Sequence, residues 1–171
     1  MDRTVFSGKI KVMLSSYLRE NMLRTLFKSD LPQLLLIEKA VHISPWTEDT
    51  FKTCFSSGYI GWVVELDKQL RGFIIVSQTG SECHILNLAV THEYQHQGFG
   101  RKLMEAALMY AKKAGVGIAY LEVRCSNLRA IKLYKNMKFQ LIGERKDYYP
   151  TVSGKEDAYI FAKSLSEEIL K

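Results

Sequence analysis

Apolar residues near the start of the chain predict a short strand followed by two helices. The run MLRTLF predicts the strand. Asp30 and Pro32 come next, and both favour a first helical turn, because Asp accepts hydrogen bonds from free amides and Pro needs no amide partner there. Apolar residues then recur at helical spacing as far as Val41. Thr47, in the stretch PWTEDTF, predicts the N-cap of a second helix that ends near Phe55.

The middle of the chain predicts three neighbouring antiparallel strands. Runs rich in β-branched and aromatic residues cover 62–66, 70–76 and 84–90. The polar stretch DKQ, at 67–69, predicts the first turn between them. Such short connections bring successive strands together as antiparallel neighbours.

The rest of the chain alternates between helical and strand-like patterns. The predicted elements are a helix over 98–114, a strand over 118–124, a helix over 127–137, and strands over 139–147 and 158–163. The turn-rich stretch YYPTVSGKED is expected to be a loop between the last two strands. The strand–helix–strand unit from His84 to Arg124 predicts a right-handed parallel crossover. The whole order predicts an α/β fold with a mixed sheet.

Length and composition fit one such domain. The chain has 171 residues, enough for a single domain with a real core, and 47% of them are hydrophobic. We expect the domain to span 22–171 and to follow an N-terminal extension, residues 1–21, that is helical or partly disordered. Met22 is an alternative candidate for the translation start. The first residues lack the apolar region of a signal peptide and no run is long enough to span a membrane, so a cytoplasmic protein is expected.

Charge and cysteine content narrow the candidate partners. The net charge is +6, which favours anionic partners such as nucleotides, nucleic acid or phosphorylated cofactors. The sequence has no long block of Lys and Arg and no recognised nucleic-acid motif, so DNA is not an expected partner. Cys54, Cys83 and Cys125 are far apart and form no CxxC or Cys/His pattern. We therefore expect neither a disulfide framework nor a metal site.

The stretch QHQGFG, residues 95–100, lies between a predicted strand and a predicted helix. A helix N-terminus has free amides and a partial positive charge, and glycine lets an anion approach this backbone without a Cβ clash. The stretch is neither a Walker A loop, which ends in GK[ST], nor a GxGxxG dinucleotide motif. By itself, the Gly-x-Gly spacing is also typical of a simple turn into a helix.

The pattern Q-x-x-G-x-G, directly after an apolar strand and before an amphipathic helix, resembles the acetyl-CoA motif of the GNAT superfamily of N-acetyltransferases. The resemblance implies a mixed, mostly antiparallel sheet flanked by helices, with a splayed parallel strand pair that forms the acetyl-CoA site. It implies acetyl-CoA as cosubstrate and no metal. The implied cofactor-binding residues are the strand end, Leu88, Ala89 and Val90, and the loop residues His96, Gln97, Gly98, Phe99, Gly100 and Arg101. His96 departs from the family pattern, in which Arg or Lys is frequent, so the contribution of its side chain to phosphate binding is open.

Three further patches resemble the bacterial ribosomal-protein alanine N-acetyltransferases. They are SPWTEDTF, YLEVRCSNLRAIKLYKNMKF and RKDYYPTVSGKEDAYIFAKSL, and the resemblance extends from about Leu26 to the C-terminus. It implies direct acetyl transfer, in a ternary complex, to a protein N-terminal α-amine, namely the N-terminal alanine of a small-subunit ribosomal protein. Acetylation of a small amine, a polyamine or a lysine side chain is the alternative within this class. A non-catalytic acetyl-CoA-binding module is the alternative from another class.

Acetyl transfer to an amine needs a base for the amine and an acid for the departing thiolate. Glu122 lies inside an otherwise apolar strand, where a carboxylate is costly unless it is paired or hydrated. The resemblance makes Glu122 the general base, Tyr134 the proton donor to the thiolate and Asn127 a pantetheine contact. Judged without the resemblance, Glu122 fits a salt bridge, for example with Arg124. Tyr134 then fits a core aromatic residue and Asn127 a helix cap.

Five more residues are weaker candidates for the acceptor side. Trp46, Tyr148 and Tyr149 fit either a peptide groove or the core. Glu156 and Asp157 fit either attraction of a basic peptide or the cap of a turn.

Overall fold

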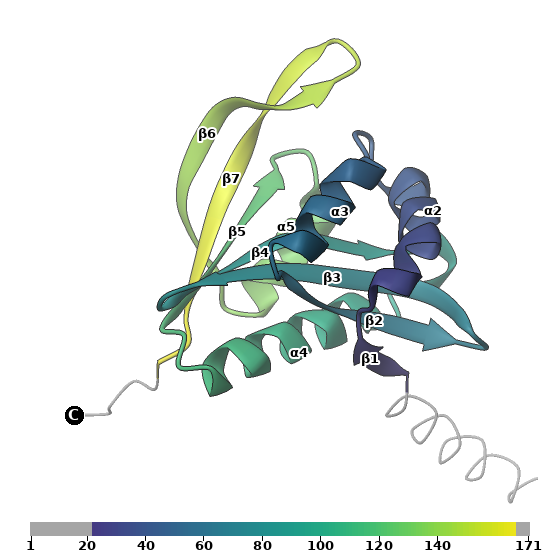
Figure 1. Ribbon diagram of the computed structural model, residues 1–171. Coiled ribbons are helices and arrows are strands. Elements are labelled where there is room, and N and C mark those ends of the chain that lie inside the picture. Colours follow the sequence, from purple (N-terminus) through teal and green to yellow (C-terminus); the bar gives the residue numbers. More distant parts are fainter. Residues whose placement is uncertain (1–21, 167–171) are drawn as a thin grey trace, which may run out of the picture.

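The computed structural model describes residues 22–166, which form one seven-stranded sheet with helices on both faces (Figure 1). The strands lie in the order β1-β2-β3-β4-β5-β7-β6, and every neighbouring pair is antiparallel except the parallel pair β4 and β5. The strands are β1 (Leu23–Thr25), β2 (Ile60–Leu66), β3 (Gln69–Thr79), β4 (Glu82–Val90), β5 (Ile118–Arg124), β6 (Gln140–Thr151) and β7 (Gly154–Ser164). The helices are η1 (Lys28–Asp30), α2 (Leu31–Val41), α3 (Glu48–Ser56), η2 (His92–Tyr94), α4 (Phe99–Lys113) and α5 (Leu128–Asn136).

Short-range sequence signals fix where the elements begin and end. Thr47 caps α3, since its side chain accepts a hydrogen bond from the Thr50 amide at 3.2 Å. Asp67 and Lys68 both have positive φ, as the tight turn between β2 and β3 requires. Gly115, with φ +78°, follows the C-cap of α4.

Two apolar cores lie on opposite faces of the sheet (Figure 1). The larger core packs α4 and α5 against the sheet and includes the fully buried Leu103 and Met104 of α4. The smaller core packs α2 and α3 against β2, β3 and β4, with Leu34 and Phe51 at 0% exposure. The helices thus hold β4 from both sides.

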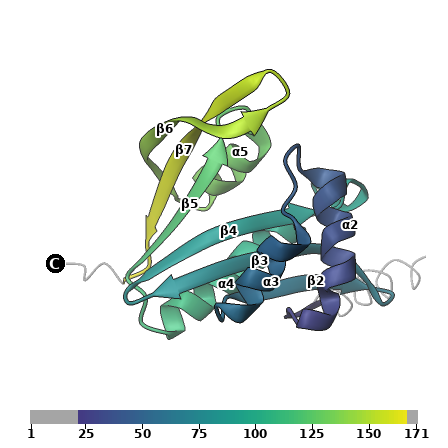
Figure 2. The ribbon, with the colours of Figure 1, turned by 45° about the horizontal axis from the view of Figure 1, so that its top comes forward.

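The sheet opens between β4 and β5, and β5, β7 and β6 turn away from the other four strands (Figure 2). The pairing of β4 with β5 ends where Ile85 faces Leu121. Beyond this pair, the edges of both strands are free of each other, which is the splayed arrangement expected from the sequence. The opening places the second halves of β4 and β5 on two sides of a cleft.

A β-bulge in β4 lies at the point of separation. Ile85 and Asn87 oppose consecutive residues of β3, so Leu86 is an extra residue in β4. Side chains alternate along a strand, and one extra residue therefore reverses the face of every residue after it. Ile85 packs in the core beside α4, whereas Ala89 packs in the core beside α2 and α3. The reversal also turns Asn87 toward α2, where it meets a side chain described below.

The α/β class, the mixed sheet and the parallel β4–α4–β5 crossover predicted from the sequence are confirmed. The predicted loop YYPTVSGKED is wrong. Most of it continues β6 and β7 as a hairpin, and only Val152 and Ser153 lie between the two strands. Turn-forming residues are tolerated here because β6 is an edge strand of the sheet, where Pro150 removes no needed ladder bond.

The N-terminal extension predicted for residues 1–21 lies outside the described residues. Met22, the alternative translation start, is the first residue that the structure describes. Within 22–166, no helix combines the length and apolarity needed to cross a membrane.

Candidate active site

The loop from His96 to Arg101 connects β4 to the N-terminus of α4. Gly98 has φ +86°, a conformation that residues with a Cβ rarely adopt, and it directly precedes the helix. A Cβ on Gly98 would meet nothing within 4 Å, and one on Gly100 would lie 3.5 Å from the Leu133 side chain. The backbone conformation at position 98 therefore favours glycine, and the space beside it at the helix N-terminus is open.

The first amides of α4 point into this open space without partners. Among the described residues, the amides of Phe99, Gly100 and Arg101 have no hydrogen-bond acceptor, and the first bonded amide is that of Lys102, to Gly98 O at 3.0 Å. Free amides at a helix N-terminus form a site for a phosphate group. The loop predicted to hold the pyrophosphate of coenzyme A thus fits that group.

Neighbouring side chains hold the loop in place. The Gln95 side chain donates to Val90 O at 2.9 Å, and the Gln97 side chain donates to Glu93 O at 2.9 Å. Arg129, at the start of α5, donates to the Gln95 side chain. His96 has φ +60° and an exposed side chain. Histidine adopts this left-handed conformation more readily than most residues, which explains its place in the loop by backbone geometry.

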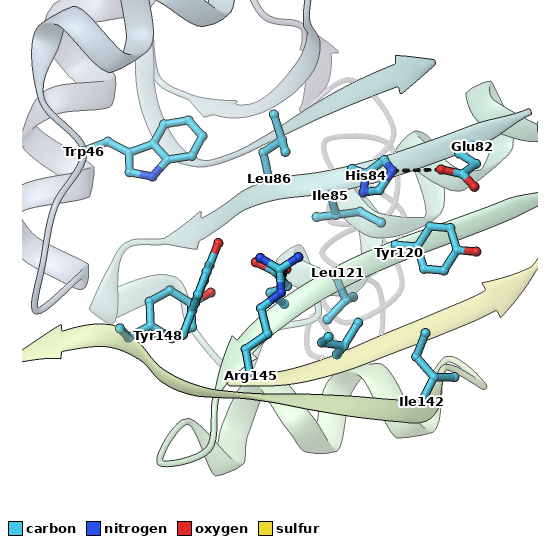
Figure 3. A pocket seen from close by; sticks show the side chains of 13 residues that line it. Trp46, Glu82, His84, Ile85, Leu86, Tyr120, Leu121, Ile142, Arg145 and Tyr148 are labelled. Carbon is cyan, nitrogen blue, oxygen red and sulfur yellow. Dashed lines mark hydrogen bonds and ion pairs between the residues drawn. The ribbon is translucent and has the colours of Figure 1, made fainter. Parts of the chain in front are cut away.

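Two adjoining cavities lie along β4 and β5, one at the opening between the strands and one beside their paired halves. One has a volume of about 330 Å³, and its lining includes Leu88, Glu122, Asn127 and Tyr134. The other, of about 560 Å³, extends between β4, β5 and β6 (Figure 3). Both are lined by six shared residues: Trp46, Ile85, Leu86, Leu121, Glu122 and Tyr149. The predicted catalytic and pantetheine-binding side chains Glu122, Tyr134 and Asn127 are thus brought to one cavity, whereas Ala89 is turned into the smaller core.

Glu122 lies on β5 where the two cavities meet, and its side chain is 28% exposed. Its carboxylate forms an ion pair with Arg145, whose Nε lies 3.1 Å from Oε1, and it raises the pKa of the neighbouring Tyr148 hydroxyl. In Figure 3, Arg145 points from β6 into the larger cavity. The prediction that Glu122 pairs with Arg124 is wrong, because the Arg124 guanidinium pairs with Glu156 at 2.7 Å.

Tyr134 lies on α5 with 6% of its surface exposed, and its ring packs near Phe139 and Phe161. Burial, and secondarily the neighbouring Tyr149, raises the pKa of the Tyr134 hydroxyl above its ordinary value. The hydroxyl is therefore protonated at neutral pH and able to donate a proton. Tyr134 is thus a core aromatic residue, and it also lines the smaller cavity.

Asn127 is the N-cap of α5. Its side chain accepts a hydrogen bond from the Ala130 amide at 3.1 Å, as the capping alternative predicted. Asn127 also lines the smaller cavity, seven residues before Tyr134. Seven residues are close to two helical turns, so Asn127 and Tyr134 lie on the same side of α5 and face the same cavity.

The acceptor-side candidates divide into two groups. Trp46 and Tyr149 line both cavities, and Tyr148 lines the larger one (Figure 3). The two acids are engaged elsewhere: Glu156 pairs with an arginine of β5, as described above, and Asp157 pairs with Lys146 at 2.6 Å. These ion pairs join β7 to β5 and to β6, and they leave the three aromatic residues to the cleft.

Four polar residues at or near the cleft were not predicted from the sequence: Glu38, Asn87, Arg129 and Arg145. Glu38 had a usable signal, since it lies four residues after Leu34 on the apolar face of α2. Asn87 and Arg145 had none, because their positions depend on the bulge and on the fold of an edge strand. Within 22–166, no group of three or more His, Cys, Asp or Glu residues is placed to hold a metal ion.

Comparison with known proteins identifies the family of this fold and cleft. The sequence pattern of the acetyltransferase (GNAT) family matches residues 21–139. The chain is 37% identical over 146 residues to the ribosomal protein bS18-alanine N-acetyltransferase of Escherichia coli (strain K12), an alignment that covers 85% of this chain and 99% of that protein. A putative enzyme of the same name from Bacillus subtilis (strain 168) is 34% identical and is covered to 95%.

Solved structures agree with this relationship. The crystal structure of the ribosomal-protein-S18-alanine N-acetyltransferase from Escherichia coli aligns with a TM-score of 0.80 and 36% identity, over 87% of this chain and 97% of that one. The structure of Arabidopsis thaliana NAA60 in complex with acetyl-CoA aligns with a TM-score of 0.74 at 22% identity, over 83% of this chain and 97% of that one, and so shares the fold. The chain belongs to the GNAT family of acetyltransferases.

Proposed function

We propose that this protein transfers the acetyl group of acetyl-CoA to the N-terminal α-amine of a protein that begins with alanine, and that the acceptor is a ribosomal protein of the bS18 type. The observation that supports the chemistry most directly is that Glu122 and Tyr134 line one cavity at the point where β4 and β5 separate. The names of relatives 34–37% identical to the chain support the acceptor. The cytoplasmic location expected from the sequence remains a prediction.

The two substrates approach from opposite ends of the cleft. The amides at the start of α4 bind the pyrophosphate of acetyl-CoA, and the free edge of β4 at Leu88 and Val90 binds its pantetheine arm. The acceptor peptide enters through the larger cavity, between Trp46 and the tyrosines of β6. The thioester and the amine then meet near Glu122, the polar residue that lines both cavities from β5.

The reaction needs two proton transfers, and the cleft has a residue for each. Glu122 accepts the proton that the amine loses as its nitrogen attacks the thioester carbonyl. Tyr134 donates a proton to sulfur as the carbon–sulfur bond breaks, and its raised pKa keeps it protonated until then. The products are the acetylated α-amine and free coenzyme A. Arg145 holds the Glu122 carboxylate at the junction of the cavities.

A panel of acceptors tests this proposal. Purified protein and acetyl-CoA are incubated with an alanine-initiated peptide of the bS18 type, the same peptide with a blocked N-terminus, a polyamine and free lysine, while the release of coenzyme A is followed. We expect release with the free peptide alone. Equal turnover with the blocked peptide, or with the polyamine, would favour side-chain or small-amine acetylation. Tight acetyl-CoA binding without release in any mixture would favour a non-catalytic module.

A further inference from the structure

Glu38 is a fully buried acid that the proposed chemistry does not use. It lies on α2 with 1% of its surface exposed, and it lines the smaller cavity. A buried carboxylate is costly unless its oxygens are paired, and both oxygens of Glu38 are paired. Oε2 accepts from the Asn87 side chain at 3.0 Å, and Oε1 accepts from the Trp46 amide at 2.9 Å. His42 Nδ1 lies 2.8 Å from Oε1.

These contacts join three parts of the cleft that are distant in sequence. Asn87 is the first residue after the β4 bulge, and it is 7% exposed. Trp46 lies in the connection between α2 and α3, directly before the N-cap Thr47, and it lines both cavities. Glu38 therefore ties the bulge, which opens the sheet, to the residue that lines the acceptor side of the opening.

Nothing else in the described residues fixes the Trp46 backbone in this way. Its ring packs on Phe51 with centroids 5.5 Å apart, but only Glu38 accepts from its amide. The adjoining connection reaches the hairpin through one exposed hydrogen bond, from Ser44 Oγ to Pro150 O at 3.3 Å. Loss of Glu38 would thus release the connection at its buried end.

We propose that Glu38 is a positioning residue of the acceptor site, which holds Trp46 against the β4 bulge so that the larger cavity fits a peptide N-terminus. This inference rests on the proposed function, in which that cavity receives the acceptor. It assigns to Glu38 an effect on acceptor binding and none on the loop from His96 to Arg101, because the side-chain contacts of Glu38 reach Asn87, Trp46 and His42 and none of these belongs to that loop.

Steady-state kinetics of matched variants test the proposal. Glu38→Ala removes all three contacts, Asn87→Ala removes one, and Glu38→Gln can retain two if the Asn87 amide turns to accept. Asp30→Ala is the control, since Asp30 is also a buried acid, is 6% exposed and pairs with Arg24 away from the cleft. Both substrates are varied separately with an alanine-initiated peptide as acceptor.

We expect Glu38→Ala to raise the KM for the peptide about tenfold, with the KM for acetyl-CoA changed less than about twofold. Asn87→Ala should shift the peptide KM in the same direction by less, and Glu38→Gln should restore it to within about threefold. Asp30→Ala should leave both KM values near those of the unmodified protein. Equal rises in both KM values, or a peptide KM that Glu38→Ala and Asn87→Ala leave unchanged, would overturn the assignment.

A fluorescence measurement separates this inference from the proposed function. In a Trp62→Phe background, Trp46 is the remaining tryptophan. Glu38→Ala should increase the quenching constant of Trp46 with acrylamide about twofold, while Asp30→Ala should not. Unchanged quenching in Glu38→Ala would overturn the positioning role whatever the acceptor is. Failure of the unmodified protein to acetylate the peptide would overturn the proposed function and leave the quenching result to decide the role of Glu38.

Discussion

The substitution Tyr134→Phe separates the chemical role of Tyr134 from its structural role. The ring is buried against Phe139 and Phe161, and phenylalanine keeps those contacts. Among the described residues, the Tyr134 hydroxyl has no hydrogen-bond partner. Its oxygen is not fully buried, and it lies at the surface of the smaller cavity. Removal of a hydroxyl from such a position should change the free energy of unfolding by no more than about 1 kcal/mol.

The same substitution should have a large effect on turnover. A positioned general acid contributes a factor of about 100 or more to a rate, which corresponds to about 2.7 kcal/mol in the activation free energy. We therefore expect kcat to fall about 100-fold. The phosphate loop is untouched, so the KM for acetyl-CoA should change by less than about threefold.

The assay is the initial rate of coenzyme A release, together with urea unfolding of the same samples. Tyr110→Phe is the matched control, because Tyr110 is 38% exposed on α4 and packs on Trp62 outside the cleft. It should retain the kcat of the unmodified protein. If Tyr134→Phe also retains that kcat, the assignment of Tyr134 as proton donor is wrong. A loss of stability of several kcal/mol would show instead that the lost rate reflects a damaged core.

Three further predictions concern the loop, the base and the fold. Gly98→Ala and Gly115→Ala both place a Cβ at positive φ, so each should cost about 1 kcal/mol in urea unfolding, but only Gly98→Ala should raise the KM for acetyl-CoA. Arg145→Ala should lower kcat/KM for the peptide about tenfold because the carboxylate of Glu122, the proposed general base, loses its orienting contact, whereas Lys146→Ala, on the same strand, should not. Burial tends to raise the pKa of Asp30, but hydrogen bonds from a guanidinium and an amide outweigh it and hold the pKa below 3.8. Asp30 therefore stabilises the fold above this pH, and acid titration followed by circular dichroism should show that this contribution is lost as the pH falls below about 4.

Most of the fold follows from local patterns in the sequence. The strand runs in the middle of the chain and the Thr47 cap each depend on neighbours within a few residues, and each appears where it was predicted. The hairpin of β6 and β7 was missed because its residues favour turns in isolation. Pairing between Tyr149 and Glu156, across the sheet edge, overrides that preference.

Residues of the candidate site that belong to a sequence motif could be predicted. Residues whose positions depend on the tertiary fold could not. Glu122 and Tyr134 belong to contiguous patterns, and the structure brings them to one cavity, while the loop glycines lie at the N-terminus of α4. The bulge at Leu86 leaves no sequence signal, yet it ends the pairing of β4 with β5 and turns Asn87 to Glu38. Arg145 reaches Glu122 from an edge strand whose register contains two shifts.

The position of the acetyl group on an acceptor peptide tests the central claim most directly. An alanine-initiated peptide of the bS18 type that also contains an internal lysine is incubated with the protein and acetyl-CoA, and the product is sequenced by tandem mass spectrometry. We expect one added acetyl group, on the α-amine of the first residue, and almost none with Glu122→Gln. An acetyl group on the lysine side chain, or a product that forms equally well with Glu122→Gln, would contradict the account.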